Sequence, residues 1–101
     1  METKITTHGN ETTVQLIGRL DTPASLEHGP ALEALQDKAD GVIILDCKEL
    51  SYISSSGLRI FLTLRKAASA KGGKVIVKSI CPEIRSVFMM TGFLNLFQIE
   101  D

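Results

Sequence analysis

The spacing of apolar residues changes along this chain, and the first spacing predicts a β-hairpin. Residues 3 to 20, "TKITTHGNETTVQLIGRL", alternate apolar and polar positions around Gly9-Asn10. Val14, Leu16 and Gly18 share one face of such a strand, while Thr13, Gln15 and Ile17 share the other. Alternation on both sides of a Gly-Asn turn is typical of two antiparallel strands.

The next segment, "DTPASLEHGPALEALQDKADG", has the start and stop residues of a helix. Asp21 or Thr22 can cap the first turn ahead of Pro23, and the helix is expected to end near Gly41. Its apolar positions include Leu26, Leu32 and Leu35. Gly29-Pro30 is expected to bend the helix or to break its first turns, because proline removes a backbone donor.

Two continuous apolar runs predict buried parallel strands joined by a helix. "VIILD" at 42–46 and "KVIVKS" at 74–79 have the length and composition of strands covered on both faces. Between them, apolar residues recur at helical spacing until Gly72-Gly73 ends the pattern. These residues are Leu58, Ile60, Phe61, Leu62, Leu64, Ala67 and Ala68. A strand, a helix and a strand of these lengths predict a right-handed crossover.

The last part of the chain predicts one more helix and a short terminal element. "PEIRSVFMMT" runs from Pro82 to a stop at Gly92, and "FLNLFQI" is either a last strand or a short amphipathic segment. Met89, Met90 and Phe93 could form an adaptable partner surface, but their helical spacing near a glycine stop favours the core. The element order β-β-α-β-α-β-α predicts an α/β fold, with helices packed on a small mixed sheet of four or five strands.

Composition narrows the class of protein. The 101 residues fit a single domain, residues 1–101, and 44% apolar residues can fill its core without a metal or a disulfide. A net charge of −1 gives no basic surface for nucleic acid, so the expected partners are proteins. No signal peptide or membrane span is visible, which predicts a cytoplasmic location without membrane insertion. Cys47 and Cys81 are expected to be reduced thiols, and no cofactor or metal site is predicted.

Three consecutive serines stand where a buried strand is followed by a helix. Function in open α/β sheets gathers beyond the carboxyl ends of parallel strands, and "YISSSG" at 52–57 falls there. Ser54 or Ser55 can cap the helix by accepting a backbone N–H. One serine suffices for a cap, so the remaining hydroxyls are available for contact or modification.

The catalytic motifs that this chain superficially offers are incomplete. A nucleophile elbow needs a glycine two residues before Ser55, where Ile53 stands, and both histidines lie in the first third of the chain. "GGK" at 72–74 precedes a strand rather than a helix, unlike a phosphate-binding loop. Asp46 and Lys78 at strand ends suit phosphoryl transfer, but no acidic pair for magnesium accompanies them. The sequence therefore predicts a binding module and not an enzyme.

Four stretches in order resemble a known family. "GRLDTPAS", "VIILDCKELSYISSSGLRIF", "GGKVIVKSI" and "VFMMTGFLNLFQI" resemble STAS domains, in particular bacterial anti-sigma factor antagonists, from about Val14 to Ile99. The resemblance implies a switch in transcription control. The unphosphorylated antagonist binds an anti-sigma factor, itself an ATP-dependent serine kinase, and so releases a sigma factor. Phosphorylation of a serine dissociates the pair, and a serine phosphatase resets the switch.

The resemblance also assigns site residues by position. The phosphate acceptor falls on Ser55, with Ser56 and then Ser54 as the next choices, and Asp21 falls where the family presents an acidic residue to the kinase. The expected partner-binding residues are Asp21, Thr22, Ser54, Ser56, Gly57 and Leu58. One departure is that Ser54 replaces an aspartate common in the family before the acceptor, which removes a charge from the binding edge.

A second function is compatible with the same resemblance. Small STAS subunits also occur in complexes that transport lipids or anions across membranes, where the same edge binds the ATPase subunit. The missing aspartate at Ser54 leaves room for this alternative. Neighbouring genes for a kinase-like ATPase would favour the sigma-factor circuit, whereas permease genes would favour transport. Either interpretation allows weak self-association.

Overall fold

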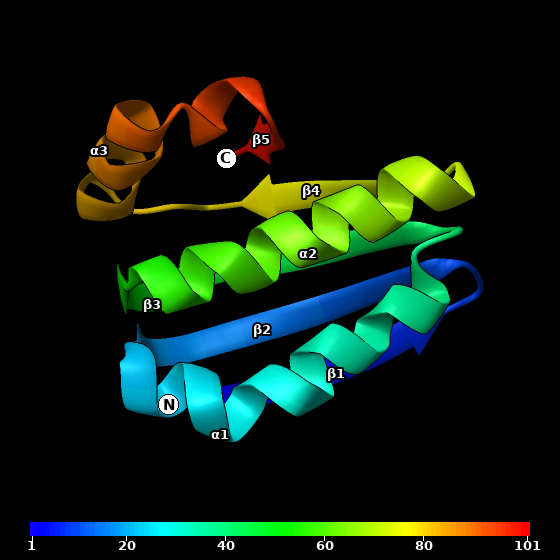
Figure 1. Cartoon of the computed structure of the whole chain (residues 1–101), viewed down its shortest axis with the longest axis horizontal. Helices are drawn as coiled ribbons and strands as arrows, with labels where there is room; N and C mark the ends of the chain where they lie inside the picture. The colour runs from blue at the N-terminus through cyan, green and yellow to red at the C-terminus, as the bar shows by residue number, and fades with distance from the viewer.

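A five-stranded sheet carries the helices of this protein. The computed structural model describes all residues, 1–101, and its strands lie side by side in the order β1-β2-β3-β4-β5 (Figure 1). The strands are β1 (Glu2–His8), β2 (Glu11–Leu20), β3 (Val42–Ile53), β4 (Lys74–Lys78) and β5 (Gln98–Glu100). The helices are α1 (Thr22–Glu33), α2 (Ser55–Lys71) and α3 (Pro82–Thr91), with short 3-10 helices η1 (Ala34–Lys38) and η2 (Phe93–Asn95). The predicted α/β fold, mixed sheet and element order are confirmed.

The sheet is mixed because only its first pair of strands is antiparallel. β1 and β2 form the predicted hairpin, with His8 opposite Glu11 and Gly9 at φ +61 in the turn between them. All other neighbours are parallel, and α1 and α2 lie on the same face of the sheet as its crossovers (Figure 1). The carboxyl ends of the parallel strands therefore all lie at the same end of the sheet.

The predicted break at Gly29-Pro30 is wrong. α1 continues through Pro30 to Glu33, changes to 3-10 geometry in η1, and ends before Gly41. The ring of Pro30 is tolerated because it lies on the exposed side of the helix, where the lost hydrogen bond is open to water. Leu26, one of the apolar positions of this segment, does not join the core, since its side chain is 76% exposed. The buried stripe of α1 runs through Ala24, Ser25, Gly29 and Leu32, and Leu26 lies off it.

The strand predicted at 42–46 is much longer than its apolar run. β3 continues to Ile53, so Asp46 and Cys47 lie within the strand and no loop separates it from the serines. Its second half pairs with Ile17 to Leu20 of β2 after register shifts, which hid the strand pattern in the sequence. The Asp46 side chain accepts the backbone N–H of Lys48 at 3.1 Å, within the strand.

The expectation that the first apolar run is covered on both faces is also wrong. Ile43, Leu45 and Cys47 are buried beneath the helices, whereas Val42 and Ile44 on the opposite face are only half-buried. All the helices that cross over the sheet pack on one side, so the other side of β3 has no covering layer (Figure 1). Parallel strands here do not require two covered faces.

The core lies between the sheet and the helices and ends in an aromatic cluster. Phe61 of α2 meets Phe88 of α3 edge to face at 6.2 Å between ring centroids. The predicted core positions Met89 and Met90 are wrong, since they are 66% and 80% exposed. α3 is one-sided and turns only Ile84 and Phe88 fully inward. None of the helices has the length and apolar character needed to cross a membrane.

Candidate functional site

The candidate site lies at the carboxyl ends of β2 and β3, where α1 and α2 begin next to each other. We call this part of the surface the serine edge. Leu20 and Ile53 are register partners at the ends of β2 and β3, and the backbone N–H of Ser54 donates to the Leu20 carbonyl at 2.9 Å. Asp21 and Ser54 follow these partners and cap α1 and α2. Since neighbouring strands lie about 4.8 Å apart, the two caps are adjacent. The first turns of α1 and α2 lie at the same end of the molecule (Figure 1).

Ser54 is the serine that caps α2. Its backbone is extended, with φ −87 and ψ 172, and its Oγ accepts the backbone N–H of Gly57 at 3.2 Å. The residue is only 8% exposed. The prediction that one serine of the triplet serves as a cap is confirmed, and Ser54 is that serine.

Ser55 and Ser56 occupy the first two helical positions of α2. Ser55 is exposed and Ser56 is half-buried, and neither hydroxyl makes a hydrogen bond within the chain. Their backbone N–H groups have no acceptor one turn earlier in the helix. These groups form the positive end of the α2 dipole, which favours a negatively charged group at this position.

Gly57 and Leu58 lie beneath the surface and fix the position of the first turn. A Cβ on Gly57 would lie 2.8 Å from Leu20 Cγ and 2.9 Å from Ile53 Cγ1, so the α2 backbone rests directly on the ends of β2 and β3. Leu58 is 9% exposed and belongs to the core cluster. Both residues thus support the exposed serine from below.

Asp21 and Thr22 form the neighbouring part of the same edge. Asp21 Oδ1 accepts the backbone N–H of Ala24 at 3.0 Å and caps α1, while Oδ2 accepts no hydrogen bond within the chain. Asp21 is half-buried and Thr22 is exposed. The carboxylate therefore caps a helix and still presents an oxygen beside the serines.

An aromatic contact that the sequence did not predict lies at this edge. The guanidinium carbon of Arg19 lies 4.3 Å from the centroid of the Tyr52 ring, across the end of β2 and β3. The two residues are register partners one position before Leu20 and Ile53, and Tyr52 is 40% exposed. Only the register shift at Gly18/Arg19 brings them together, so no local pattern in the sequence announces the contact.

The two cysteines differ in burial and are both free thiols. Cys47 is fully buried, and burial, with smaller contributions from Asp46 and Cys81, raises its pKa to about 12. Cys81 is half-buried at the start of α3, and its thiol lies 3.7 Å from the Leu50 carbonyl oxygen. A buried protonated thiol behaves as a small apolar side chain, so Cys47 is a core residue.

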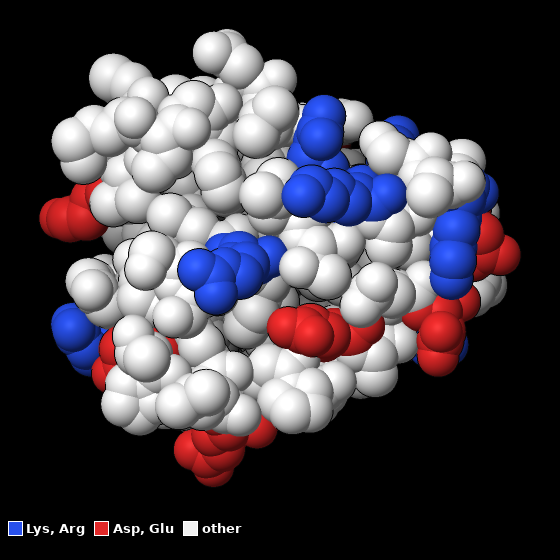
Figure 2. Space-filling model, in the orientation of Figure 1, with Lys and Arg blue, Asp and Glu red and all other residues white.

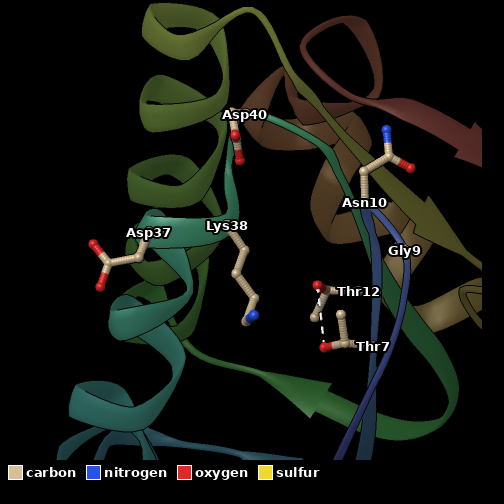
Figure 3. Close-up of a pocket in the computed structure, with 7 residues that line it drawn as sticks. All are labelled: Thr7, Gly9, Asn10, Thr12, Asp37, Lys38 and Asp40. Atoms are coloured by element: carbon tan, nitrogen blue, oxygen red, sulfur yellow. Dashed lines mark hydrogen bonds between the residues drawn. The ribbon is translucent and has the colours of Figure 1, made fainter.

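A polar hollow lies at the opposite end of the sheet from the serines. It has a volume of about 320 Å³ and no apolar lining residue. Figure 3 shows the Lys38 side chain pointing into this hollow toward Thr7 and Thr12, whose hydroxyls are 3.5 Å apart, while Asp37 points away. Its charged and polar lining comes from the β1–β2 turn and from the region around η1. The hollow is therefore separate from the serine edge.

The chain matches a known protein family along almost its whole length. The family model described as STAS domain matches residues 2–101. The chain belongs to the STAS domain family. The match extends over all five strands and includes both capped helix starts, so it is longer than the resemblance of the four sequence stretches, which ran from about Val14 to Ile99.

The STAS domain is also similar to individual proteins named anti-sigma factor antagonists. It is 37% identical to a putative anti-sigma factor antagonist, BtrV, of Bordetella bronchiseptica over 69% of this chain and 60% of that protein. It is 32% identical to the anti-sigma F factor antagonist of Paenibacillus polymyxa, over 87% of this chain and 76% of the relative. The solved structure of the Bacillus cell fate determinant SpoIIAA in its phosphorylated form matches with a TM-score of 0.75 at 21% identity, over 97% of this chain and 90% of that one. The resemblance to STAS domains, in particular anti-sigma factor antagonists, is confirmed.

Proposed function

We propose that this STAS domain is an anti-sigma factor antagonist in which Ser55 is the phosphorylation switch. The unmodified chain binds an anti-sigma factor that is a serine kinase, and phosphorylation of Ser55 releases it. The relatives of the same name support the binding role, and the exposed serine edge supports the switch. A serine phosphatase that restores the hydroxyl and a cytoplasmic location belong to the same proposal.

The different environments of the three serines carry this proposal. Ser54 Oγ is buried and already accepts the Gly57 N–H, and Ser56 is half-buried. Ser55 alone is exposed, with a hydroxyl that makes no bond within the chain. A kinase must bring this oxygen in line with the γ-phosphate of ATP. The O–P bond to Ser55 forms as ADP leaves, and the serine proton is released, so the most accessible hydroxyl is the favoured acceptor.

The phosphate is expected to change binding much more than folding. A phosphoserine carries about −1.5 to −2 charges, and the end of the α2 dipole stabilises such a charge by about 0.3 to 1 kcal/mol. At a protein interface the same group must lose water and lies beside the Asp21 carboxylate. Repulsion of even about 1.4 kcal/mol lowers affinity tenfold. The modification can therefore release a partner without unfolding the domain.

The missing aspartate before the acceptor fits the structure of this chain. At position 54 the side chain is a cap, and a serine oxygen satisfies the Gly57 N–H as an aspartate oxygen would. The substitution therefore leaves the helix start intact and removes one negative charge. The carboxylate of Asp21 remains the acidic group of this edge.

The test is an affinity capture from native lysate with four forms of the protein as bait. These are the wild type, Ser55→Ala, Ser55→Asp and Ser69→Asp, a control that places the same charge on the exposed distal part of α2. Mass spectrometry identifies the partners and the modified serine. We expect a kinase-type ATPase to be held by all forms except Ser55→Asp, and phosphate to map to Ser55.

Two results would contradict the proposal. If Ser55→Asp holds the kinase as well as Ser69→Asp does, charge at position 55 is not the switch. If all four baits capture the ATPase of a transporter and the serines are unmodified, the chain is a subunit of a transport complex. A partial loss with Ser55→Asp still supports the switch, because an aspartate carries less charge than a phosphate.

A further inference from the structure

Arg59 lies one helical turn after Ser55 on the same side of α2. Residues four apart on a helix are surface neighbours, with Cβ atoms about 5 to 6 Å apart. Ser55 and Arg59 are both exposed, whereas Leu58 and Ile60 on either side of Arg59 are buried. The guanidinium can therefore reach any group carried by the Ser55 oxygen.

The charge of Arg59 is uncompensated within the chain. Its guanidinium makes no ion pair and no hydrogen bond to another residue, and the ion pair that the protein does contain joins Arg85 to Asp101 at 3.7 Å. No other charged side chain occurs between residues 50 and 64. Figure 2 shows one basic patch over the first half of α2, with more basic side chains over the second half of the helix and an acidic patch over neighbouring α1. A cation without an ion-pair partner in its own chain is suited to an acidic group on a binding partner.

We propose that the binding partner of Arg59 depends on whether Ser55 is phosphorylated. In the unmodified chain its guanidinium binds an acidic side chain of the anti-sigma factor, and in the modified chain the phosphate on Ser55 binds the guanidinium instead. This proposal rests on the proposed function. It involves only ionic and hydrogen-bond contacts, because a guanidinium presents paired N–H donors that match two phosphate oxygens.

The geometry favours the intramolecular pair once the phosphate is present. The anionic residue lies N-terminal to the cationic one at a spacing of four, which is the better orientation on a helix. The phosphate is tethered to the same turn, so it needs no association step to meet Arg59. The local charge of this pair changes from +1 to between about −0.5 and −1, which is the guanidinium charge plus that of the phosphate. An acidic partner group then loses its cation and meets an anion.

The intramolecular pair can be tested without a kinase or a partner. Phosphoserine is installed at position 55 during translation, and the second ionisation of the phosphate is followed by phosphorus NMR in the wild type, Arg59→Gln and Lys66→Gln. Lys66 is the control, since it is an exposed cation two turns further along α2. A neighbouring cation stabilises the dianion and lowers its pKa.

We expect the titration midpoint of Arg59→Gln to lie several tenths of a pH unit above that of the wild type, with Lys66→Gln unchanged. The difference should shrink in 1 M salt, where the screening length is about 3 Å. Equal midpoints in the wild type and Arg59→Gln would overturn the intramolecular pair. Circular dichroism of each variant shows that the fold is retained.

Other ionisable groups near α2 are identical in all three proteins and cancel in this comparison. On α2 and the elements that contact it they are Arg65 and Lys71 of α2, Glu27, His28 and Glu33 of α1, Asp37 and Lys38 of η1, Asp46, Cys47, Lys48, Glu49 and Tyr52 of β3, and Lys74 and Lys78 of β4, with Asp21 as the α1 cap. A difference in midpoint between variants therefore reports the substituted residue.

The partner half of the proposal is tested with the unmodified chain and the purified kinase from the capture experiment. We expect Arg59→Gln to bind at least threefold more weakly than the wild type and Lys66→Gln to bind equally. Equal binding by Arg59→Gln would overturn this half. The proposed function fails separately, if phosphoserine at position 55 leaves the affinity for the kinase unchanged even though the NMR midpoint depends on Arg59.

Discussion

The backbone at Gly57 packs directly against the Leu20 side chain: a Cβ at position 57 would lie 2.8 Å from Leu20 Cγ. Ile53 Cγ1 would be almost as close, at 2.9 Å, and both neighbours are themselves buried. The first turn of α2 therefore sits on the ends of β2 and β3 with no room for a methyl group. This contact fixes the position of Ser55 relative to the ends of β2 and β3.

Replacing Gly57 by alanine should destabilise the protein by about 1 to 3 kcal/mol, the usual cost of overpacking. The matched control is Gly29→Ala, because a Cβ there would meet Ile60 Cδ1 at an ordinary 3.8 Å. Alanine is a better helix former than glycine, so this control should be neutral or stabilising by up to about 1 kcal/mol. Urea denaturation measures both. Equal losses in the two variants would contradict the close packing at Gly57.

Removal of the Ser54 cap should lower the stability of the protein, whereas removal of the proposed phosphorylation site at Ser55 should not. Ser54→Ala leaves the Gly57 N–H without its acceptor and should cost about 1 kcal/mol. Ser55→Ala removes a hydroxyl that makes no bond within the chain and should change stability by less than about 0.5 kcal/mol. Thermal unfolding of the two variants distinguishes them. A larger loss from Ser55→Ala than from Ser54→Ala would reverse the assigned roles.

The two thiols should react at very different rates with iodoacetamide. Cys47 is fully buried with a pKa raised to about 12, so almost no thiolate is present at neutral pH. Cys81 is half-buried and should be alkylated first in the native protein. Peptide mapping after timed labelling, with and without denaturant, measures each site. Labelling of Cys47 in the native protein at the rate of Cys81 would show that it is accessible.

The same thiol makes stability depend on alkaline pH. Its pKa is about 12 in the folded protein against an ordinary value of 9.0, so above pH 9 the unfolded chain loses the proton while the folded protein keeps it. Stability should therefore fall as pH rises from 9 toward 12, by up to about 1.4 kcal/mol per unit from this group. Denaturation curves at pH 8 to 11 should show a shallower fall for Cys47→Ala than for the wild type, with Cys81→Ala as the control. Parallel slopes in Cys47→Ala and the wild type would contradict the raised pKa.

The exposed methionines of α3 should tolerate polar replacement, unlike their neighbour in the aromatic cluster. Met89→Gln and Met90→Gln should each change stability by less than about 0.5 kcal/mol, because both side chains are mostly exposed. Phe88→Ala should cost about 3 to 5 kcal/mol, since the ring is fully buried against Phe61, Phe93 and Phe97. Denaturant titration of the three variants provides the comparison. A loss above about 2 kcal/mol from either methionine would place it in the core.

Elements with a strong local pattern could be predicted from the sequence alone. The hairpin turn at Gly9, the α3 helix from Pro82 and its stop at Gly92 are set by residues that are close in the chain. Elements that depend on distant partners were harder to predict. The second half of β3 has no apolar run and becomes a strand because β2 supplies its hydrogen bonds. Pro30 remains helical because its ring lies on the exposed side of α1, a side that becomes known only once the helix is packed on the sheet.

The sequence by itself determined the order of elements, the kinship with STAS domains and the position of the serine triplet between a strand and a helix, because periodicity, turn residues and motif order are local properties of a chain. Only the tertiary structure decided that Ser54 is the cap and Ser55 the exposed hydroxyl. It also decided that Asp21 begins α1 beside them and that Arg19 stacks on Tyr52. These facts depend on the register of β2 against β3. Register is fixed by burial of distant residues and cannot be read from either strand alone.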